Sequence, residues 1–493
     1  MLSERIARPA LPVFLVLCAA TASAQPPSSF SAQDFSTHAM ISVSASVVVL
    51  DHVRLIDGTG SPARADQALV LSHGKILAVG PESSVIVPAG ATRIDANGET
   101  VFPGIVGLHD HLYYSASIAT ERADGFANGP GFYVTELPYT APRLYLASGV
   151  TTLRTTGSVE PYTDLRITQQ IRSGAMPGPK MDVSAPYLEG APTQFAQMHP
   201  LKDADEARRM VDFWSSEGMT SFKAYMDISR TELGAAIAEA HAQHHKLTGH
   251  LCSVTWPEAI SLGIDDLEHG PIFTDTEFST TKHADVCPTD GESSWLHHSI
   301  SEPAVQALIH SLVEHHVAVT STLPVFEAMV PGRPPLTRRF TDALAPAALQ
   351  SYLTLRAVMP LTSPMTPLFR KEMDFELAFA RAGGLLLAGP DPTGNGGVLA
   401  GFGDQREIEL LVEAGFTPVE AIAIATRNGA QYLGQLDHIG TIAPGKDADL
   451  VLVHGDPSTH IADIENIVTV FRDGTGYDPA RLLASVRGQV GIW

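Results

Sequence analysis

Residues 102–111 read FPGIVGLHDH, a short apolar run that ends in two histidines two positions apart. A short apolar run of this kind is typical of a buried strand. Side chains at positions i and i+2 of a strand project to the same face, so His109 and His111 can bind one metal ion together. This stretch therefore predicts a buried strand with a metal site at its carboxyl end.

Seven further apolar runs follow the first, separated by segments with helical periodicity such as residues 204–214 and 232–244. Alternating strands and helices indicate parallel βαβ units. The alternation predicts the α/β fold class, and eight is the number of strands that closes a (β/α)₈ TIM barrel. The eight runs are IVGLHDH (105–111), GVTTLRTTG (149–157), KMDVSAPYL (180–188), TSFKAYM (220–226), KLTGH (246–250), IDDLEHG (264–270), VAVTSTL (317–323) and LLLAGPD (385–391).

Segments with β-character flank the alternating region, which spans residues 102–432. Short β-runs punctuated by Gly, Pro and Asp occupy residues 43–101, and similar runs return within residues 433–493. One connection, residues 271–317 after the sixth strand, is unusually long and rich in Thr, Ser, Asp and His. It lies where a lid over a substrate would sit.

The first 24 residues have the layout of a cleaved secretory signal peptide. Arg5 and Arg8 precede the apolar residues 11–20, and small residues at 22–24 supply a cleavage site. The apolar core is too short to span a bilayer. We therefore expect a periplasmic or secreted mature chain that begins near Gln25.

The net charge limits the kinds of partner that we expect, and the cysteine content limits the number of disulfides. A formal net charge of −22 repels phosphate backbones and anionic lipids, so we expect neither a nucleic-acid nor a membrane partner. Cys252 and Cys287 remain after signal cleavage, and an oxidising compartment would permit a disulfide between them. Their Cα separation cannot be read from the sequence, and we favour two separate buried thiols over the disulfide.

Candidate metal-ligand residues stand at the carboxyl ends of five of the eight predicted strands. Barrel enzymes place their catalytic groups at this rim. Apart from the histidine pair, each candidate arrives alone from its own strand, as a ring of ligands around a barrel axis requires. The candidates are His109 and His111 (first strand), Lys223 (fourth), His250 (fifth), His269 (sixth) and Asp391 (eighth).

Several motifs in combination resemble those of the amidohydrolase superfamily, in particular its imidazolonepropionase-like and prolidase-like members. The resemblance runs from about Val48 to Asp456 and implies a TIM barrel beside a small β-sandwich, which the N- and C-terminal β-segments form together. The motifs are FPGIVGLHDH (102–111), FKAY (222–225), TGH (248–250), LEHG (267–270), AGPD (388–391), ATRNGAQYLG (425–434) and GTIAPGKDADLVLV (440–453).

The resemblance implies two divalent metal ions, and the ligand types suit zinc while tolerating manganese or cobalt. Lys223, carboxylated by CO₂, would bridge the two ions, because a bare ammonium cannot bind a cation whereas its carbamate offers two oxygens. The remaining ligands implied are His109, His111 and Asp391 for one ion and His250 and His269 for the other.

The implied mechanism is hydrolysis by a water that the two ions activate. Asp391 would take the proton from this nucleophile and pass it to the leaving amine. Pro390 and Pro392 flank Asp391, where the family usually has small or hydroxylated residues. This departure affects the orientation of the Asp391 carboxylate. Tyr225, on the same strand face as Lys223, would donate a hydrogen bond to the substrate or the developing oxyanion. The alternative for Tyr225 is simple packing at the rim.

The sequence thus predicts an exported binuclear amidohydrolase that cleaves an amide or peptide C–N bond in a dipeptide or an N-acyl amino acid. It does not decide between a monomer and a homo-oligomer. A lactonase or a phosphotriesterase is the alternative within the superfamily, since the same metal pair can attack an ester or a phosphorus centre. A deaminase fits less well, because no Glu closely follows His250. An inactive binding or scaffold protein is the alternative from another class.

Overall fold

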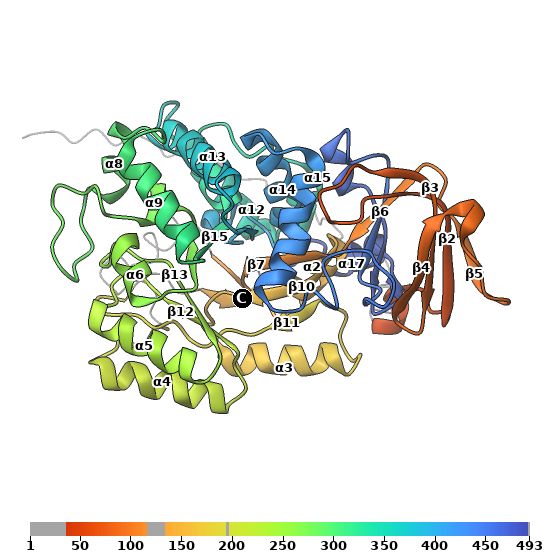
Figure 1. The fold of residues 1–493 in the computed structure, drawn as a ribbon, viewed down its shortest axis with the longest axis horizontal. Coiled ribbons are helices and arrows are strands. Elements are labelled where there is room, and N and C mark those ends of the chain that lie inside the picture. Colours follow the sequence, from red (N-terminus) through yellow and green to blue (C-terminus); the bar gives the residue numbers. More distant parts are fainter. Residues whose placement is uncertain (1–35, 116–133, 194–196, 492–493) are drawn as a thin grey trace, which may run out of the picture. The chain divides into compact units, whose positions relative to one another are not determined.

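The computed structural model describes residues 36–115, 134–193 and 197–491 (Figure 1). The predicted signal peptide, residues 1–24, lies outside the described residues. Within them the chain has a mixed α/β fold, in which parallel strands and their helices adjoin a nine-stranded sheet. Among the helices described, none is long and apolar enough to cross a membrane.

Eight short strands form where the eight apolar runs predict them, and most of their residues are buried. The strands are β7 (Ile105–Asp110), β10 (Val150–Thr155), β11 (Lys180–Asp182), β12 (Ser221–Ala224), β13 (Lys246–Gly249), β14 (Asp266–Glu268), β15 (Ala318–Ser321) and β16 (Leu386–Ala388). They pair in two parallel ladders, β11–β10–β7 and β12–β13–β14–β15–β16. Further backbone contacts connect the ladders: Leu188 forms a parallel bridge with Ala224, and the Asp391 amide donates to the His109 carbonyl at 3.1 Å.

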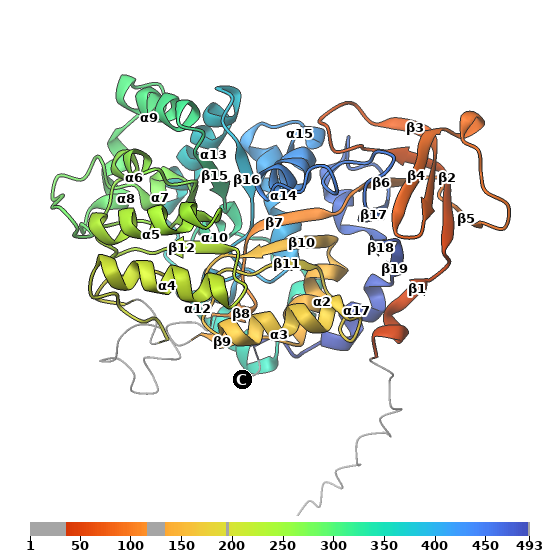
Figure 2. The ribbon, with the colours of Figure 1, turned by 60° about the horizontal axis from the view of Figure 1, so that its bottom comes forward.

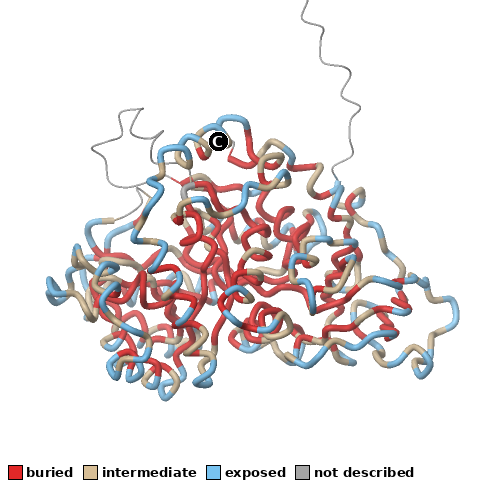
Figure 3. Tube along the Cα trace, turned by 90° about the horizontal axis from the view of Figure 1, so that it is seen from above, coloured by how far each residue is buried: buried red, intermediate tan, exposed pale blue. Residues whose placement is uncertain are grey.

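Helices alternate with these strands and surround them (Figure 2). Buried residues run through the strand region, whereas exposed residues lie on the outer helices and loops (Figure 3). Ser229 and Glu232 form a capping box that starts α5, a few residues after the end of β12. The main helices are α2 (Thr140–Ala147), α3 (Pro161–Arg172), α4 (Ala204–Ser216), α5 (Arg230–Ala242), α6 (Trp256–Leu262), α9 (Pro303–Glu314), α13 (Met365–Arg381) and α14 (Phe402–Ala414).

Two connections at the carboxyl ends of the strands are long. The expected insertion, residues 271–317, is shorter than predicted, because its last part is α9, an ordinary helix between β14 and β15. A second long connection, residues 322–364, was not predicted. Helical periodicity marks its helices, but it does not say which helix packs on a strand and which belongs to an insertion. The short helices of the two connections are α7 (Pro271–Thr274) and α8 (Gly291–Ser294) in the first, and α10 (Leu323–Glu327), α11 (Arg338–Ala343) and α12 (Pro346–Val358) in the second.

The β-segments from the two ends of the chain form one sheet with the strand order β1-β19-β18-β17-β6-β2-β3-β4, and β5 also pairs with β2. Its strands are β1 (Ile41–Val43), β2 (Val47–Leu55), β3 (Arg64–Ser72), β4 (Lys75–Pro81), β5 (Thr92–Asp95), β6 (Glu99–Pro103), β17 (Leu450–His454), β18 (Ile467–Arg472) and β19 (Thr475–Tyr477). Val101 of β6 pairs with Leu452 of β17 in antiparallel register. Leu50, Leu69 and Phe471 belong to one apolar core. The segments predicted to form a sandwich thus share one continuous sheet and one apolar core.

Cys252 and Cys287 form a disulfide, with their Cα atoms 4.9 Å apart. Our expectation of two separate thiols is therefore wrong. The loop that carries Cys287 folds back onto the end of β13, where the Thr276 hydroxyl donates to the Cys252 carbonyl at 2.9 Å. Asp285 pairs with Arg230 at 2.9 Å and holds the same loop to the start of α5.

Removal of this disulfide should lower the stability of the folded chain. The two cysteines are 35 positions apart, and a cross-link that closes a loop of this size contributes about 3 to 4 kcal/mol in the chain-entropy model. We expect the Cys252→Ser/Cys287→Ser double variant to unfold at a lower denaturant concentration than the oxidised wild type. Dithiothreitol should shift the wild type to the midpoint of the double variant and leave that variant unchanged. Equal midpoints for all samples would contradict the bond.

Candidate metal centre at the carboxyl ends of the strands

The side chains predicted to bind metal lie together in the structure. The ring centroid of His109 is 4.5 Å from that of His269 and 5.3 Å from that of His111. The His250 ring lies 4.4 Å from the His269 ring by the same measure. Lys223 reaches the group from β12, with its Nζ 3.2 Å from His109 Nε2. Four strand ends thus converge on one buried point.

Asp391 joins this group from the end of β16. Its Oδ1 lies 3.4 Å from His111 Nε2, and its Oδ2 lies 3.9 Å from His109 Nε2. One ligand atom from each of the three residues lies within 4.8 Å of the others. Burial by itself would raise the pKa of Asp391, but His109 and His111 outweigh it and hold that pKa well below its usual value. Two imidazoles and an ionised carboxylate are a donor set that zinc accepts.

A buried ring nitrogen supports this interpretation. His269 Nε2 has no hydrogen-bond partner among the described residues. The other nitrogen of His269, Nδ1, lies 2.8 Å from the Thr322 hydroxyl, so the unpartnered nitrogen is the one left for a ligand. A buried polar atom without a partner is costly, and coordination of a cation removes that cost. The donor set therefore fits a divalent metal ion.

The backbone is strained at two of the candidate ligands. The φ angles of His269 and Asp391 are 71° and 46°, in the left-handed region that residues with side chains seldom adopt. Such strain persists only where the surrounding structure imposes it, and it clusters at functional sites. At Asp391 the imposing contact is the hydrogen bond from its amide to the His109 carbonyl.

Lys223 is almost fully buried, with 1% of its surface exposed. Burial lowers its pKa to about 8, although Glu268 and Asp391 act in the opposite direction. About one molecule in ten then carries a neutral amine at pH 7, far more than for a free lysine with a pKa of about 10.4. A neutral amine is the form that reacts with CO₂.

Tyrosines line one side of the site. The ring of Tyr225 lies 4.8 Å from His250 and 4.9 Å from Tyr187, and Lys223 Nζ lies 5.5 Å from both tyrosine rings. The Tyr187 and Tyr113 hydroxyls are 2.7 Å apart, which places a third phenol beside the metal candidates. Tyr113 and Tyr187 were not among the site residues predicted from the sequence. A signal existed for Tyr113, because it continues the two-residue alternation of the histidine pair.

Glu268 is a further residue of the site that the sequence did not predict. Its Oε2 lies 2.6 Å from His109 Nδ1, and neither side chain has exposed surface. The residue directly precedes His269 in the motif LEHG, but alternation along a strand turns it away from its neighbour. Glu268 meets His109 only because β14 and β7, which are not neighbouring strands, bring these side chains together in the folded chain.

A second cluster of carboxylates, formed by Asp447, Asp449 and Asp473, has a different explanation. Lys180 Nζ lies within 2.7 to 2.9 Å of a carboxylate oxygen of each of the three. The ammonium of Lys180 thus occupies the position that a metal ion would take. This cluster joins β11 to the nine-stranded sheet.

The chain is similar to known proteins over most of its length. Residues 396–476 match the model of the amidohydrolase family. The imidazolonepropionase of Stenotrophomonas maltophilia (strain R551-3) is 25% identical over 422 residues, which cover 81% of this chain and 89% of the relative. A solved Xaa-Pro dipeptidase has a TM-score of 0.64 at 19% identity and covers 88% of this chain and 100% of its own. Phenylurea hydrolase B has a TM-score of 0.63 at 21% identity, with coverages of 88% and 97%.

The metal-centre interpretation predicts that His111→Ala weakens zinc binding by more than about 100-fold, because loss of a ligand costs more than loss of a residue behind it. The matched control is His316→Ala, which removes an exposed imidazole after the end of α9. Equilibrium dialysis of chelator-treated protein against zinc measures both. Equal affinities of the two variants would contradict the location of the site.

Proposed function

Since the chain is a hydrolase of the amidohydrolase superfamily, of the imidazolonepropionase and prolidase type, we propose that it is an exported binuclear metalloenzyme. It hydrolyses the amide or peptide C–N bond of a dipeptide or an N-acyl amino acid. The observation that carries this proposal is the convergence of donor side chains from five separate strands on one buried point.

The proposed scaffold is a (β/α)₈ barrel that spans residues 102–432. The bridge between Leu188 and Ala224 and the hydrogen bond from Asp391 to His109 support closure at the two gaps between the ladders. In such a barrel the carboxyl ends of all strands meet at one rim, where enzymes of this architecture place their catalytic groups.

The cofactors we propose are two divalent ions, most simply zinc, one held by His109, His111 and Asp391 and the other by His250 and His269. When bound, they supply Lewis acidity and a water whose pKa is lowered toward neutrality. The ligand types support zinc, since imidazole and carboxylate suit it.

Asp391 is the proposed proton carrier. Its carboxylate is ionised between two imidazoles, and an ionised carboxylate has lone pairs with which to accept the proton that the attacking water releases. It then delivers this proton to the nitrogen of the departing amine, which leaves as a neutral group. Tyr225 stands beside His250 and is the proposed hydrogen-bond donor to the oxygen of the scissile carbonyl.

Lys223 is the proposed bridge between the two ions. Attack of its neutral amine on CO₂ forms an N–C bond and releases one proton, so the side chain gains a carboxylate. Burial favours this reaction, because it lowers the pKa of the lysine to about 8 and thereby raises the neutral fraction.

Export is also part of the proposal. The disulfide between Cys252 and Cys287 supports it, since disulfides persist mainly in oxidising compartments. This agrees with the signal peptide expected at residues 1–24, which lies outside the described residues.

The reaction is tested by a hydrolysis screen of the zinc-loaded protein. Dipeptides and N-acyl amino acids should be turned over, while His111→Ala should lose that turnover under the same conditions. Lactones and phosphotriesters serve as the competing classes. Turnover restricted to esters or triesters would move the enzyme to another branch of the superfamily. No turnover by folded, zinc-loaded protein would indicate a binding protein.

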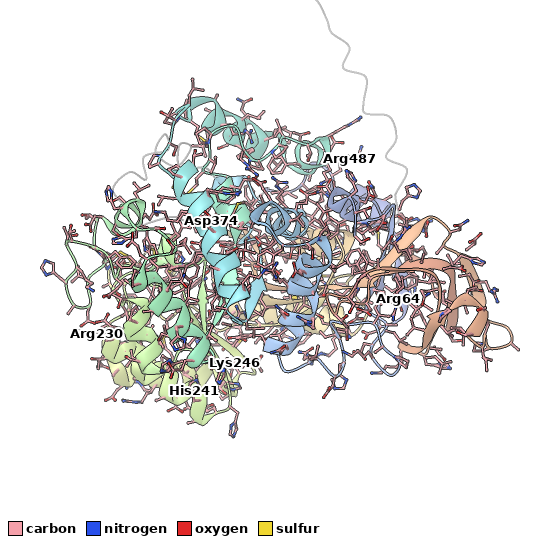
Figure 4. All side chains as sticks on the ribbon, turned by 45° about the horizontal axis from the view of Figure 1, so that its top comes forward. Arg64, Arg230, His241, Lys246, Asp374 and Arg487 are labelled. Carbon is pink, nitrogen blue, oxygen red and sulfur yellow. A yellow bond between two sulfur atoms is a disulfide. The ribbon has the colours of Figure 1, made fainter. Side chains whose placement is uncertain are left out.

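A second prediction concerns the bridge. Lys223→Ala should lose about half of its bound metal along with its activity, because both ions share this ligand. Added formate or acetate should restore part of both by supplying a bridging carboxylate. Lys246→Ala is the control, since Lys246 lies at the opposite end of the adjacent strand, with its Nζ 4.0 Å from the Tyr432 ring centroid (Figure 4). Two ions per chain in Lys223→Ala, measured by elemental analysis, would contradict the bridge.

A further inference from the structure

A buried carboxylate lies behind the histidine at the centre of the site. Glu268 Oε2 is 2.6 Å from His109 Nδ1, and the opposite ring nitrogen of His109 faces Lys223 Nζ at 3.2 Å. A carboxylate accepts from an imidazole only when the facing nitrogen carries the proton. Glu268 therefore keeps the proton of His109 on Nδ1 and leaves the lone pair of Nε2 for the metal centre.

Arg154 fixes the position of this carboxylate. Its Nη2 donates to Glu268 Oε1 at 2.9 Å, and its Nε donates to the backbone carbonyl of Leu108 at 2.7 Å. Leu108 is the residue before His109, so one guanidinium holds both the strand that carries the histidine and the carboxylate that orients it. Arg154 has 1% of its surface exposed, and its Nη2 is shared between the carboxylates of Glu268 and Asp266.

Neighbouring strands complete the hydrogen bonding of this group. The Thr248 hydroxyl donates to Glu268 Oε1 at 2.5 Å. Asp266, the other carboxylate bound by Arg154 Nη2 at 2.9 Å, accepts from the Thr320 hydroxyl at 2.9 Å. Glu268 thus has a partner for each oxygen and no freedom to turn away from His109. Asp266 has the same guanidinium partner but faces no candidate ligand.

The charges of the group also suit a cation beyond His109. Two carboxylates share one guanidinium, and the nearby Lys223 ammonium would be lost in the proposed carbamate, which leaves a net negative charge in a region without exposed surface. An unbalanced buried charge is costly. A divalent ion on the far side of the imidazole offsets that charge and strengthens the hydrogen bond between His109 and Glu268.

We propose that Glu268, anchored by Arg154, is a positioning residue that sets the tautomer and the ring orientation of His109 for metal binding. This inference rests on the proposed function, because it requires a metal ion at His109. A carboxylate behind a ligating histidine raises metal affinity without touching the ion.

The test compares two variants that remove the same charge from the same guanidinium. Glu268→Gln places an amide beside His109, whereas Asp266→Asn changes the equally buried neighbour that faces no candidate ligand. Zinc affinity of the metal-free protein, measured by competition with a chromophoric chelator, should fall about 10- to 100-fold in Glu268→Gln. Asp266→Asn should stay within about threefold of the wild type. Thermal melting of the metal-free forms shows whether each variant is folded.

Each outcome of this experiment supports or overturns the positioning role of Glu268. Equal affinity losses in the two variants would show that the loss of a buried negative charge explains the effect, and would overturn the positioning role. An unchanged affinity in both variants would also overturn it. Should Glu268→Gln fail to fold, Glu268→Asp retains the charge but withdraws it from His109, and it should show the same weakening. Unchanged zinc binding by Glu268→Asp would overturn the inference. Absence of zinc binding in the wild type would overturn the proposed function, and this inference with it.

Discussion

The centre of this molecule holds many polar groups that water does not reach, and this constraint governs the structure around them. His109, Arg154, Asp266 and Glu268 have at most 1% of their surface exposed. Each buried polar atom needs a partner, or its desolvation is not compensated. Hydrogen bonds between strands satisfy most of them, as with Arg154 and its two carboxylates. The imidazole nitrogens that remain are the ones a metal ion would satisfy.

The strands carry the candidate ligands, and the long connections line the space beside them. The candidate ligands stand at strand ends, where the backbone is fixed by parallel neighbours. The two long connections, after β14 and β15, meet beside them: Phe273 of α7 stacks on Phe326 of α10 at 3.5 Å, and Phe326 lies 5.8 Å from His269. Variation in loops of this kind changes the substrate of a barrel enzyme without moving its catalytic groups.

Side-chain and backbone contacts, as well as the covalent chain, join the nine-stranded sheet to the parallel-strand region. The pairing of β6 with β17 joins the two ends of the sequence directly before the strand that carries His109. Lys180, at the start of β11, reaches three aspartates around β17 and β18. Because these contacts come from segments far apart in the sequence, neither region is completed until the last quarter of the chain has folded.

Local patterns in the sequence determined the elements and the candidate ligands. Apolar runs predicted all eight parallel strands, because burial on both faces leaves a signal within a few residues. Alternation along the first strand placed His109 and His111 on one face, and the end of each run located the other candidates. The tertiary structure decided the partners. Glu268 is 159 positions from His109, and Cys287 is 35 from Cys252. Such pairs depend on which strand ends meet in the folded chain and on where a loop packs, and no pattern within a few residues encodes either.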